Sequence, residues 1–393
     1  MADRKKRVVH RRRIQPIWLI TAAVALLLVW AVVQYRQDMA APPATQPPTE
    51  AVAAVGDTIT IAAAGDINIS QPLMDQALQS DGSYDFSSQF VGVASLLSNA
   101  DLTVVDLETN FCGAPYDAQQ NNAPESLLSA LAQAGVDLAQ TANTASIYNG
   151  VAGLESTLAA VEAAGLTPVG TFASSRQGEP KYTIVRTQGF RVAFVAFTKG
   201  VGNLRLPQGA EDCVNLLYTD YSTTYQQVDE EGIRQVLDAV AAEEPDITIA
   251  LLHWGSEYDR EISQTQRQIQ SIMLEGGVDV ILGAHSHLVG EVETGQDGLT
   301  AFSLGNLLSV DSQSGTNQGV VLRLEFTMEE EGAKLTSWQY DPVYLSGTTL
   351  VNTNDAIALY ESGYVDRVSQ ELYELLCRSR DQIAELIQPE PEA

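Results

Sequence analysis

Histidine is scarce in this chain of 393 residues, which contains only four. His10 lies in a basic head, so the rest of the chain has three: His253, His285 and His287. His253 ends the apolar run ITIALLH, and the other two follow the run VDVILGA as an H-x-H pair. Imidazole is the commonest neutral metal ligand near pH 7. We therefore predict a metal site, the alternative being hydrogen-bonded polar groups at sheet edges.

Cysteine is equally scarce, and its spacing excludes one kind of metal site. Cys112, Cys213 and Cys377 form an odd set whose pairing the sequence does not reveal, although the first two both lie in polar loop sequence that allows them to pair. No Cys-x-x-Cys or Cys–His spacing occurs, which argues against zinc binding by cysteine.

Net positive charge is confined to the first thirteen residues. The chain has a net charge of −28, but this head contributes +6, so the remainder carries −34. A domain of that charge repels nucleic acid and anionic lipid headgroups, and we expect no nucleic-acid partner. Ordinary solubility explains the acidity, and attraction of divalent cations by local acidic patches is the alternative.

The basic head, residues 1–13, precedes an uncharged apolar stretch at residues 14–33. Twenty apolar residues in a helix span about 30 Å, the hydrocarbon thickness of a bilayer. Because positive charge stays on the cytoplasmic side, we predict a single-pass plasma-membrane protein with a cytoplasmic N-terminus and an extracellular domain. Small residues at Met39-Ala40-Ala41 leave a cleaved signal peptide as the alternative. Residues 34–57, rich in Pro and Ala, predict a linker.

Beyond the linker, short apolar runs alternate with amphipathic stretches. The predicted strands are 59–63, 102–107, 136–141, 191–197, 247–253, 278–283, 299–304 and 319–326. The predicted helices are 88–99, 125–134, 153–164, 226–243 and 264–275. Alternation of this kind predicts an α/β domain at residues 58–350, with the later strands antiparallel. Residues 351–393 predict a terminal helix pair and a tail.

Polar side chains that favour divalent ions follow several of the predicted strands. Asp66 ends TITIAAAGD, Asp106 and Glu108 end LTVVDLE, and Asn143 follows a weaker strand. In α/β sheets, ligands gather outside the carboxyl ends of the strands. The predicted metal ligands are Asp66, Glu108, Asn143, His253, His285 and His287. This mixed oxygen and nitrogen set suits Mn, Zn or Fe and hydrolysis at a phosphorus or carbonyl centre.

Six segments resemble, in order, those of the CapA family of poly-γ-glutamate capsule biosynthesis proteins, which is similar to the calcineurin-like metallophosphoesterases. They are AAAGDINIS, VVDLETNFCG, TANTASIYNG, LLHWGSEY, GGVDVILGAHSHLVGEVE and AFSLGNLL. The resemblance implies a four-layer α/β/β/α sandwich with a metal centre at the strand ends. It places the family's metal-site positions at Asp66, Glu108, His253, His285 and His287.

The third segment departs from the family pattern, which usually reads Ala-Asn-Asn-His-Ala. Thr144 stands where the second Asn is expected, and Ala145 stands where the proton-donating His is expected. The resemblance implies an extracellular protein that makes, anchors or remodels an anionic polymer of the poly-γ-glutamate type, as a metal-dependent hydrolase or transferase alongside polymer synthesis and export proteins. The departure keeps two alternatives open: a non-catalytic surface scaffold, and a metal-dependent phosphoesterase with another proton donor.

Overall fold

The computed structural model describes residues 52–176, 178–179, 181–295 and 298–387. Its α-helices are α2 (Gln71–Ala77), α3 (Ser87–Phe90), α4 (Ala94–Ser98), α5 (Ser126–Ala134), α6 (Gly150–Ala163), α7 (Glu230–Ala241), α8 (Gln264–Glu275), α9 (Thr353–Glu361) and α10 (Gln370–Ile387). Its strands are β1 (Thr58–Ile67), β2 (Leu102–Leu107), β3 (Leu138–Gln140), β4 (Thr167–Val169), β5 (Thr183–Thr187), β6 (Phe190–Thr198), β7 (Ile247–His253), β8 (Val280–Ala284), β9 (Val292–Gly295), β10 (Gly298–Ala301), β11 (Asn306–Leu308), β12 (Gln318–Glu329), β13 (Gly332–Ser346) and β14 (Thr349–Asn352).

The strands of the described residues form two mixed sheets. The first has the order β14-β13-β12-β1-β2-β3-β4, with β11 paired to β1, and the second has the order β5-β6-β7-β8-β10-β9. The strands from β1 to β4 are parallel, as are β6, β7, β8 and β10. The β12–β13–β14 meander is antiparallel, which confirms the prediction that part of the sheet system is antiparallel. The later strand β10, however, pairs parallel with β8.

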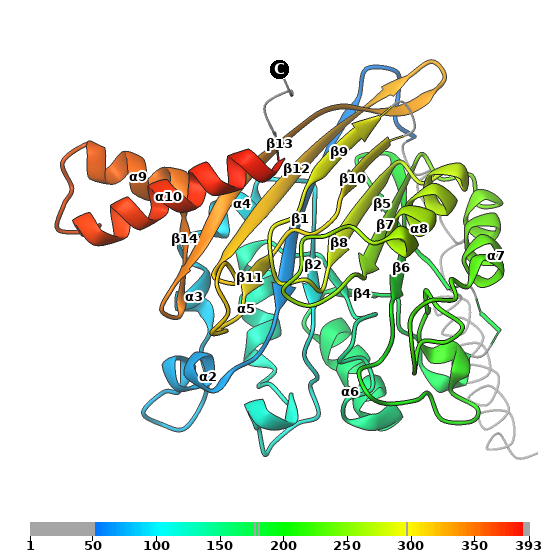
Figure 1. The fold of residues 1–393 in the computed structure, drawn as a ribbon, viewed down its shortest axis with the longest axis horizontal. Coiled ribbons are helices and arrows are strands. Elements are labelled where there is room, and N and C mark those ends of the chain that lie inside the picture. The colour runs from blue at the N-terminus through cyan, green and yellow to red at the C-terminus, as the bar shows by residue number, and fades with distance from the viewer. Residues whose placement is uncertain (1–51, 177, 180, 296–297, 388–393) are drawn as a thin grey trace, which may run out of the picture. The chain divides into compact units, whose positions relative to one another are not determined.

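Side chains alternate between the two faces of each sheet, and this alternation builds four layers (Figure 1). On β7, Ile249 and Leu251 face the other sheet, whereas Ala250 and Leu252 pack under α7 and α8. On the other sheet, even-numbered β1 residues such as Ala62 pack against α2–α5. Fully burying a side chain of the size of Leu251 or Leu252 stabilises the fold by about 1.5–3 kcal/mol. The predicted α/β/β/α sandwich is confirmed.

Two predicted elements differ from the prediction, one interrupted and one shorter. The helix predicted at 88–99 is two short helices, α3 and α4, because Gly92 passes so close to β14 that a Cβ there would lie 2.3 Å from the carbonyl oxygen of Leu350. The strand predicted at 299–304 ends at Ala301. The chain then turns at Gly305 (φ +69°), leaves the second sheet and pairs as β11 with β1 of the first. This crossing carries the SLGN sequence to the edge where the candidate ligands lie.

The predicted terminal helix pair is present as α9 and α10, which pack on Tyr344 of β13 through a small cluster that includes Ile357 and Leu376. Cys112, Cys213 and Cys377 are each free, so the first two do not pair. The predicted anchor at residues 14–33 lies outside the described residues. Within the described ranges, no helix combines the length and the apolar character needed to cross a bilayer.

Candidate metal centre

The predicted ligands come from different strands and meet at one edge of the sandwich. Asp66 is the penultimate residue of β1, and Glu108 directly follows β2. On the second sheet, His253 is the last residue of β7, and His285 and His287 follow β8. All five are buried, with exposed fractions of their side chains and backbone from 0% to 7%. The carboxyl ends of parallel strands from both sheets therefore converge on one point.

The backbone around these residues is tightly constrained. Gly65 packs so closely on the β11 crossing that a Cβ would lie 1.8 Å from the carbonyl oxygen of Gly305. Glycine is therefore required at that position, and it lets the backbone N–H of Asp66 donate to the same carbonyl at 3.0 Å. His285 and His287 have φ values of 91° and 60°, a left-handed conformation that is costly for a residue with a side chain. Strain of this kind clusters at functional sites.

The ligand atoms form two overlapping groups. Glu108, His253 and His285 make one group, and Asp66, Glu108 and His287 make the other, with the atoms of each group within 4.8 Å of one another. Bonds of roughly 2 Å to a shared ion bring ligand atoms to about 4 Å or less, so small side-chain shifts complete either group. Glu108 belongs to both, and a carboxylate has two oxygens with which to serve two ions.

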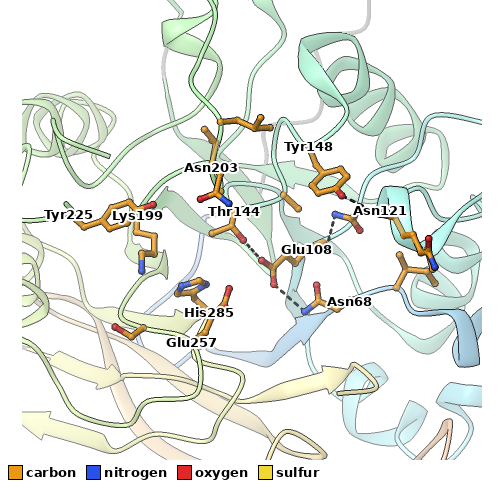
Figure 2. A pocket seen from close by; sticks show the side chains of 18 residues that line it. Asn68, Glu108, Asn121, Thr144, Tyr148, Lys199, Asn203, Tyr225, Glu257 and His285 are labelled. Carbon is orange, nitrogen blue, oxygen red and sulfur yellow. Dashed lines mark hydrogen bonds between the residues drawn. The ribbon is translucent and has the colours of Figure 1, made fainter. Parts of the chain in front are cut away.

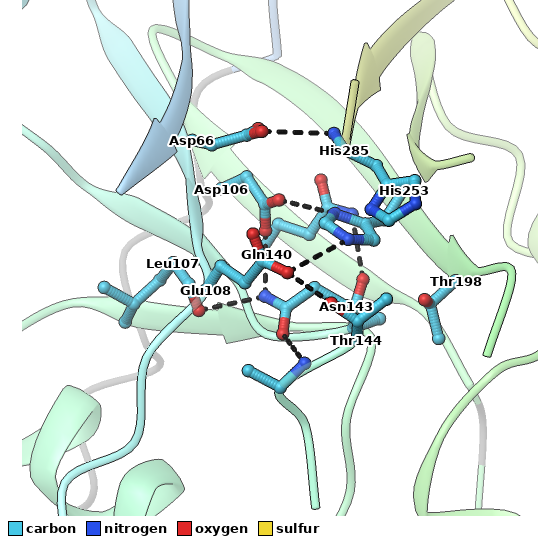
Figure 3. Close-up of polar contacts among 12 residues, drawn as sticks. Asp66, Asp106, Leu107, Glu108, Gln140, Asn143, Thr144, Thr198, His253 and His285 are labelled. Atoms are coloured by element: carbon cyan, nitrogen blue, oxygen red, sulfur yellow. Dashed lines mark hydrogen bonds and ion pairs between the residues drawn. The ribbon is translucent and has the colours of Figure 1, made fainter. Parts of the chain in front are cut away.

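The carboxylate of Glu108 lies beside imidazoles of both groups, and Figure 3 shows it next to His253. The Nε2 atom of His253 lies 3.4 Å from Glu108 Oε1, and Nε2 of His287 lies 3.9 Å from Glu108 Oε2. The Nδ1 atom of His287 lies 2.9 Å from Asp66 Oδ2. The backbone N–H of His285 donates to the same Asp66 oxygen at 3.2 Å.

Among the residues that the structure describes, three buried polar atoms at this point have no hydrogen-bond partner. They are Asp66 Oδ1, His253 Nε2 and His285 Nδ1. Buried polar atoms are almost always paired, so three orphaned atoms from three candidate ligands require a partner. Divalent cations at the two ligand groups would satisfy them, one at His253 and His285 and the other at Asp66. The mixed oxygen and nitrogen donor set is one that such ions accept. The residues therefore fit a divalent metal, while Mn, Zn or Fe as its identity stays a prediction.

Asp106 is a member of the centre that the predicted ligand set omits. Its Oδ2 atom lies 2.7 Å from Nδ1 of His253, and its Oδ1 accepts from the side-chain amide of Asn143 at 2.9 Å. A carboxylate that receives the second ring N–H of a ligating histidine fixes the tautomer and the ring orientation. The sequence does contain a signal for Asp106. Every second residue of a strand lies on the same face, so Val104, Asp106 and Glu108 all face the other sheet.

Both the nitrogen and the oxygen of the Asn143 side-chain amide make hydrogen bonds to other protein groups. The Nδ2 atom donates to Asp106 and to the carbonyl of Leu107, each at 2.9 Å, and Oδ1 accepts from the backbone of Ala145 at 3.1 Å. The structure thus gives Asn143 a positioning role behind Asp106. Its predicted role as a ligand stays a prediction.

The charges of the centre are strongly coupled. Burial raises the pKa of Asp106 to about 6, although the adjacent His253 opposes that rise. Burial also opposes the charge of Glu108, but the three surrounding imidazoles outweigh it and lower the pKa of Glu108. Burial disfavours a charged His253, yet Asp106 and Glu108 raise its pKa to about 10. Without a metal, this imidazole supplies the positive charge that the carboxylates need.

The other two imidazoles respond to their neighbours in opposite directions. Burial opposes the charge of His287, but Asp66 and Glu108 raise its pKa to about 9. Burial and the nearby His253 hold the pKa of His285 well below its ordinary value. His285 is therefore neutral at physiological pH, which is the form that binds metal.

Both oxygens of Glu108 also accept hydrogen bonds from polar side chains in the segments that follow β1 and β3 of the first sheet. The hydroxyl of Thr144 donates to Oε1, and the amide of Asn68 donates to Oε2 at 3.1 Å. Thr144 stands where the resemblance leads one to expect Asn, and here it orients the shared carboxylate together with Asn68. The adjacent Ala145 offers only a methyl group, and the part of the chain that the structure describes has no imidazole outside the centre.

A cleft of about 1050 Å³ opens over Glu108 and His285 (Figure 2). Its walls are about equally polar and apolar and include the amides of Asn68, Asn121 and Asn203. Trp254, the residue after His253, is buried. Its ring stacks on Phe302, and its N–H donates to the carbonyl of that residue at 3.0 Å.

Asn306, in the SLGN sequence, ties the strand ends together. Its Oδ1 lies 3.0 Å from Nδ1 of His287, and its Nδ2 donates to the carbonyl of Thr316 at 2.8 Å. The β11 crossing therefore orients His287 from behind, as Asp106 orients His253.

Comparison with known proteins matches this chain to one family. The family model described as bacterial capsule synthesis protein PGA_cap matches residues 60–311, well over half of the chain and all of both ligand groups. The chain is 26% identical over 168 residues to the PGA biosynthesis protein CapA of Bacillus subtilis (strain 168), which covers 43% of this chain and 41% of that protein. It is 33% identical over 63 residues to the capsule biosynthesis protein CapA of Bacillus anthracis, covering 16% and 15%. The matched segment thus spans less than half the length of either relative.

Solved structures with similar chains include two phosphoesterases. A calcineurin-like phosphoesterase of Bacillus subtilis aligns with 82% of this chain and 99% of its own, at 12% identity and a TM-score of 0.44. A 5′-nucleotidase of Candida albicans aligns with 86% of this chain and 58% of its own, at 12% identity and a TM-score of 0.43.

Proposed function

The chain belongs to the bacterial capsule synthesis protein family, and from this membership we propose that it acts on an anionic surface polymer through a divalent metal site. The polymer is of the poly-γ-glutamate type, and the action is its synthesis, anchoring or remodelling. One observation carries the proposal: Glu108 joins two buried ligand groups, in which Asp66, His253 and His285 present atoms without a hydrogen-bond partner among the described residues. The cleft above Glu108 supplies room for a polymer segment.

In this proposal each residue of the centre has a defined task. Glu108, His253 and His285 hold one ion, and Asp66, Glu108 and His287 hold a second. A divalent ion at such a site polarises a carbonyl or phosphoryl oxygen and makes water a better nucleophile at neutral pH. Asp106 keeps a proton on Nδ1 of His253, so that Nε2 faces Glu108. Thr144 and Asn68 fix the orientation of the Glu108 carboxylate.

We further propose that residues 14–33 anchor the chain in the plasma membrane, with the basic head inside and the metal centre outside. The uncharged twenty-residue stretch and the preceding arginines and lysines support this placement. Polymer synthesis and export proteins in the same membrane are the proposed partners. Deleting residues 1–33 should move the chain from the membrane to the soluble fraction. Recovery of the shortened chain in the membrane fraction would contradict the anchor.

The proposed activity is tested on the purified full-length chain in detergent. Bound metal is measured first, and turnover of γ-glutamyl and phosphodiester substrates is then followed with and without added Mn²⁺. We expect metal-dependent turnover that the His253→Ala variant loses, because Nε2 of His253 is one of the orphaned ligand atoms. The exposed Asp75→Asn change on α2 is the control and should retain wild-type turnover. Turnover that persists in chelator would contradict a metal-dependent reaction.

One observation favours a second candidate, a surface scaffold without turnover. Ala145 lines the cleft where the resemblance leads one to expect a proton-donating histidine. General acid catalysis contributes about 10²–10⁴-fold, so its loss is compatible with binding alone. Bound metal with no turnover on either substrate class supports the scaffold. Phosphodiesterase activity created by Ala145→His, with Thr144→Asn, would show that the site retains the geometry of an ancestral reaction.

A further inference from the structure

Among the described residues that line the cleft, Lys199 is the only lysine or arginine. Glu108 and Glu257 also line the cleft, and the chain beyond the basic head carries −34. An anionic molecule is therefore repelled by most of this surface. A half-buried ammonium group beside the metal centre is the exception, and it requires an explanation.

The position of Lys199 is fixed from three directions. Its backbone N–H donates to the carbonyl of His253 at 2.8 Å, which ties it to the strand end that carries a candidate ligand. Its Nζ donates to the carbonyl of Gly255 at 2.5 Å and lies 4.6 Å from the centre of the Tyr225 ring. An ammonium has three N–H donors, so donors remain beyond the one that Gly255 receives. Figure 2 shows the side chain pointing into the cleft near His285.

Arg205 provides an internal comparison. It lies six residues further along the same connection, but it is exposed and does not line the cleft. The two cations therefore differ in placement, although the sequence presents them as equivalent. Only Lys199 is held where a molecule bound over Glu108 and His285 meets it.

We propose that Lys199 binds a carboxylate or phosphate group of the molecule whose reacting part lies over Glu108 and His285. This inference rests on the proposed function, since it assigns the substrate-recognition residue of the same centre. The amides of Asn68, Asn121 and Asn203 line the same cleft and supply donors and acceptors for the uncharged parts of such a molecule. Lys199 selects for the negative charge, and the surrounding acidic surface excludes anions that fail to reach it.

The test measures ligand binding to the full-length chain in detergent, with Mn²⁺ and with chelator, by calorimetry. Three probes are compared: γ-linked triglutamate, the same peptide with its α-carboxylates converted to amides, and glycerol phosphate. Lys199→Met should weaken binding of an anionic probe by about 10- to 100-fold, the range of a hydrogen bond to a charged group. Lys199→Arg should recover most of that loss, and Arg205→Met should bind as the wild type does.

Each outcome bears on the inference. A loss confined to triglutamate identifies a carboxylate ligand, and a loss confined to glycerol phosphate identifies a phosphate ligand. Unchanged binding of both anions, no binding of either anion by the wild type, or an equal loss for the amidated peptide would overturn the role of Lys199. Mn²⁺ binding in the same titrations reports separately on the metal centre. A chain that binds anions through Lys199 but takes up no metal would therefore contradict the proposed function alone.

Discussion

The Nδ1 atom of His253 lies 2.7 Å from Oδ2 of Asp106, with both side chains buried between the two sheets. This contact joins the carboxyl end of β7 to that of β2, residues 147 positions apart in the chain. It leaves Nε2 of the same ring without a hydrogen-bond partner and directed at Glu108. The pair therefore presents an oriented imidazole to the centre of the site (Figure 3).

Replacing Asp106 with asparagine should weaken metal binding. The amide keeps the size of the side chain but removes the negative charge that fixes the His253 tautomer, and loss of such a partner costs about 10- to 100-fold in affinity. Competition with a fluorescent chelator measures this change. Asp75→Asn, which alters an exposed carboxylate, is the matched control. Equal affinities for the Asp106→Asn variant and the wild type would show that Asp106 does not orient the ligand.

Ion stoichiometry should separate the two ligand groups. Because Glu108 belongs to both groups, Glu108→Gln should reduce binding of every ion, whereas Asp66→Asn should affect only the group that contains His287. Titration of the metal-free chain with Mn²⁺, followed by elemental analysis, counts the ions retained. We expect up to two per chain in the wild type and one in Asp66→Asn. Identical losses in the two variants would mean that the groups form a single site.

The metal-free chain should become less stable as pH rises above about 6.5. The pKa of His253 is raised to about 10 and that of His287 to about 9, so the folded chain holds these protons more tightly than the unfolded chain does. The resulting stabilisation is complete below the unfolded pKa of about 6.5 and is lost as pH rises toward 10. Denaturant unfolding in chelator should show a free energy of unfolding that falls steadily between pH 6.5 and 10.

A variant and a metal-loaded sample provide the controls for this pH dependence. His253→Gln should flatten the decrease, since the glutamine does not titrate. In the metal-loaded chain the dependence should reverse at the acid end, because protons compete with the ion for the imidazoles. A metal-free wild type whose stability increases between pH 6.5 and 9 would contradict the charge arrangement.

A methyl group at Gly65 should destabilise the fold and displace Asp66. The added Cβ would lie 1.8 Å from the carbonyl oxygen of Gly305, so β1 and the β11 crossing must separate. Overpacking of this kind costs about 1–3 kcal/mol or more. Gly82→Ala is the comparison, because its Cβ meets open space and only its φ of +86° is unfavourable. Thermal unfolding of both variants measures the difference, and equal melting temperatures would argue against the clash.

The sequence predicted the elements that have continuous apolar runs. The strand at 102–107, the strand at 247–253 and the helix at 264–275 have the predicted bounds, because burial on both faces leaves a strong hydrophobic signal. The strands β13 and β14 were not predicted. Residues 332–342 of β13 are largely polar and partly exposed, so their pairing with β12 depends on contacts that composition does not report.

The candidate site was predictable to a similar extent. Asp66, Glu108 and the three histidines each end an apolar run, and the rule that ligands gather at strand ends brings them together. Asp106 was left out because two carboxylates so close in sequence cannot be assigned to ligand and support without the partner strand. Lys199 could not be distinguished from Arg205, since its placement depends on Tyr225 and Gly255, which lie elsewhere in the chain.

The most direct test of the central claim is an anomalous-difference map from crystals of the Mn²⁺-loaded chain. The arrangement described above predicts a peak within roughly 2–2.5 Å of a Glu108 oxygen and of ring nitrogens from His253 and His285. A second peak is expected between Asp66, Glu108 and His287. A map from fully loaded crystals with no peak at Glu108 would contradict the metal centre.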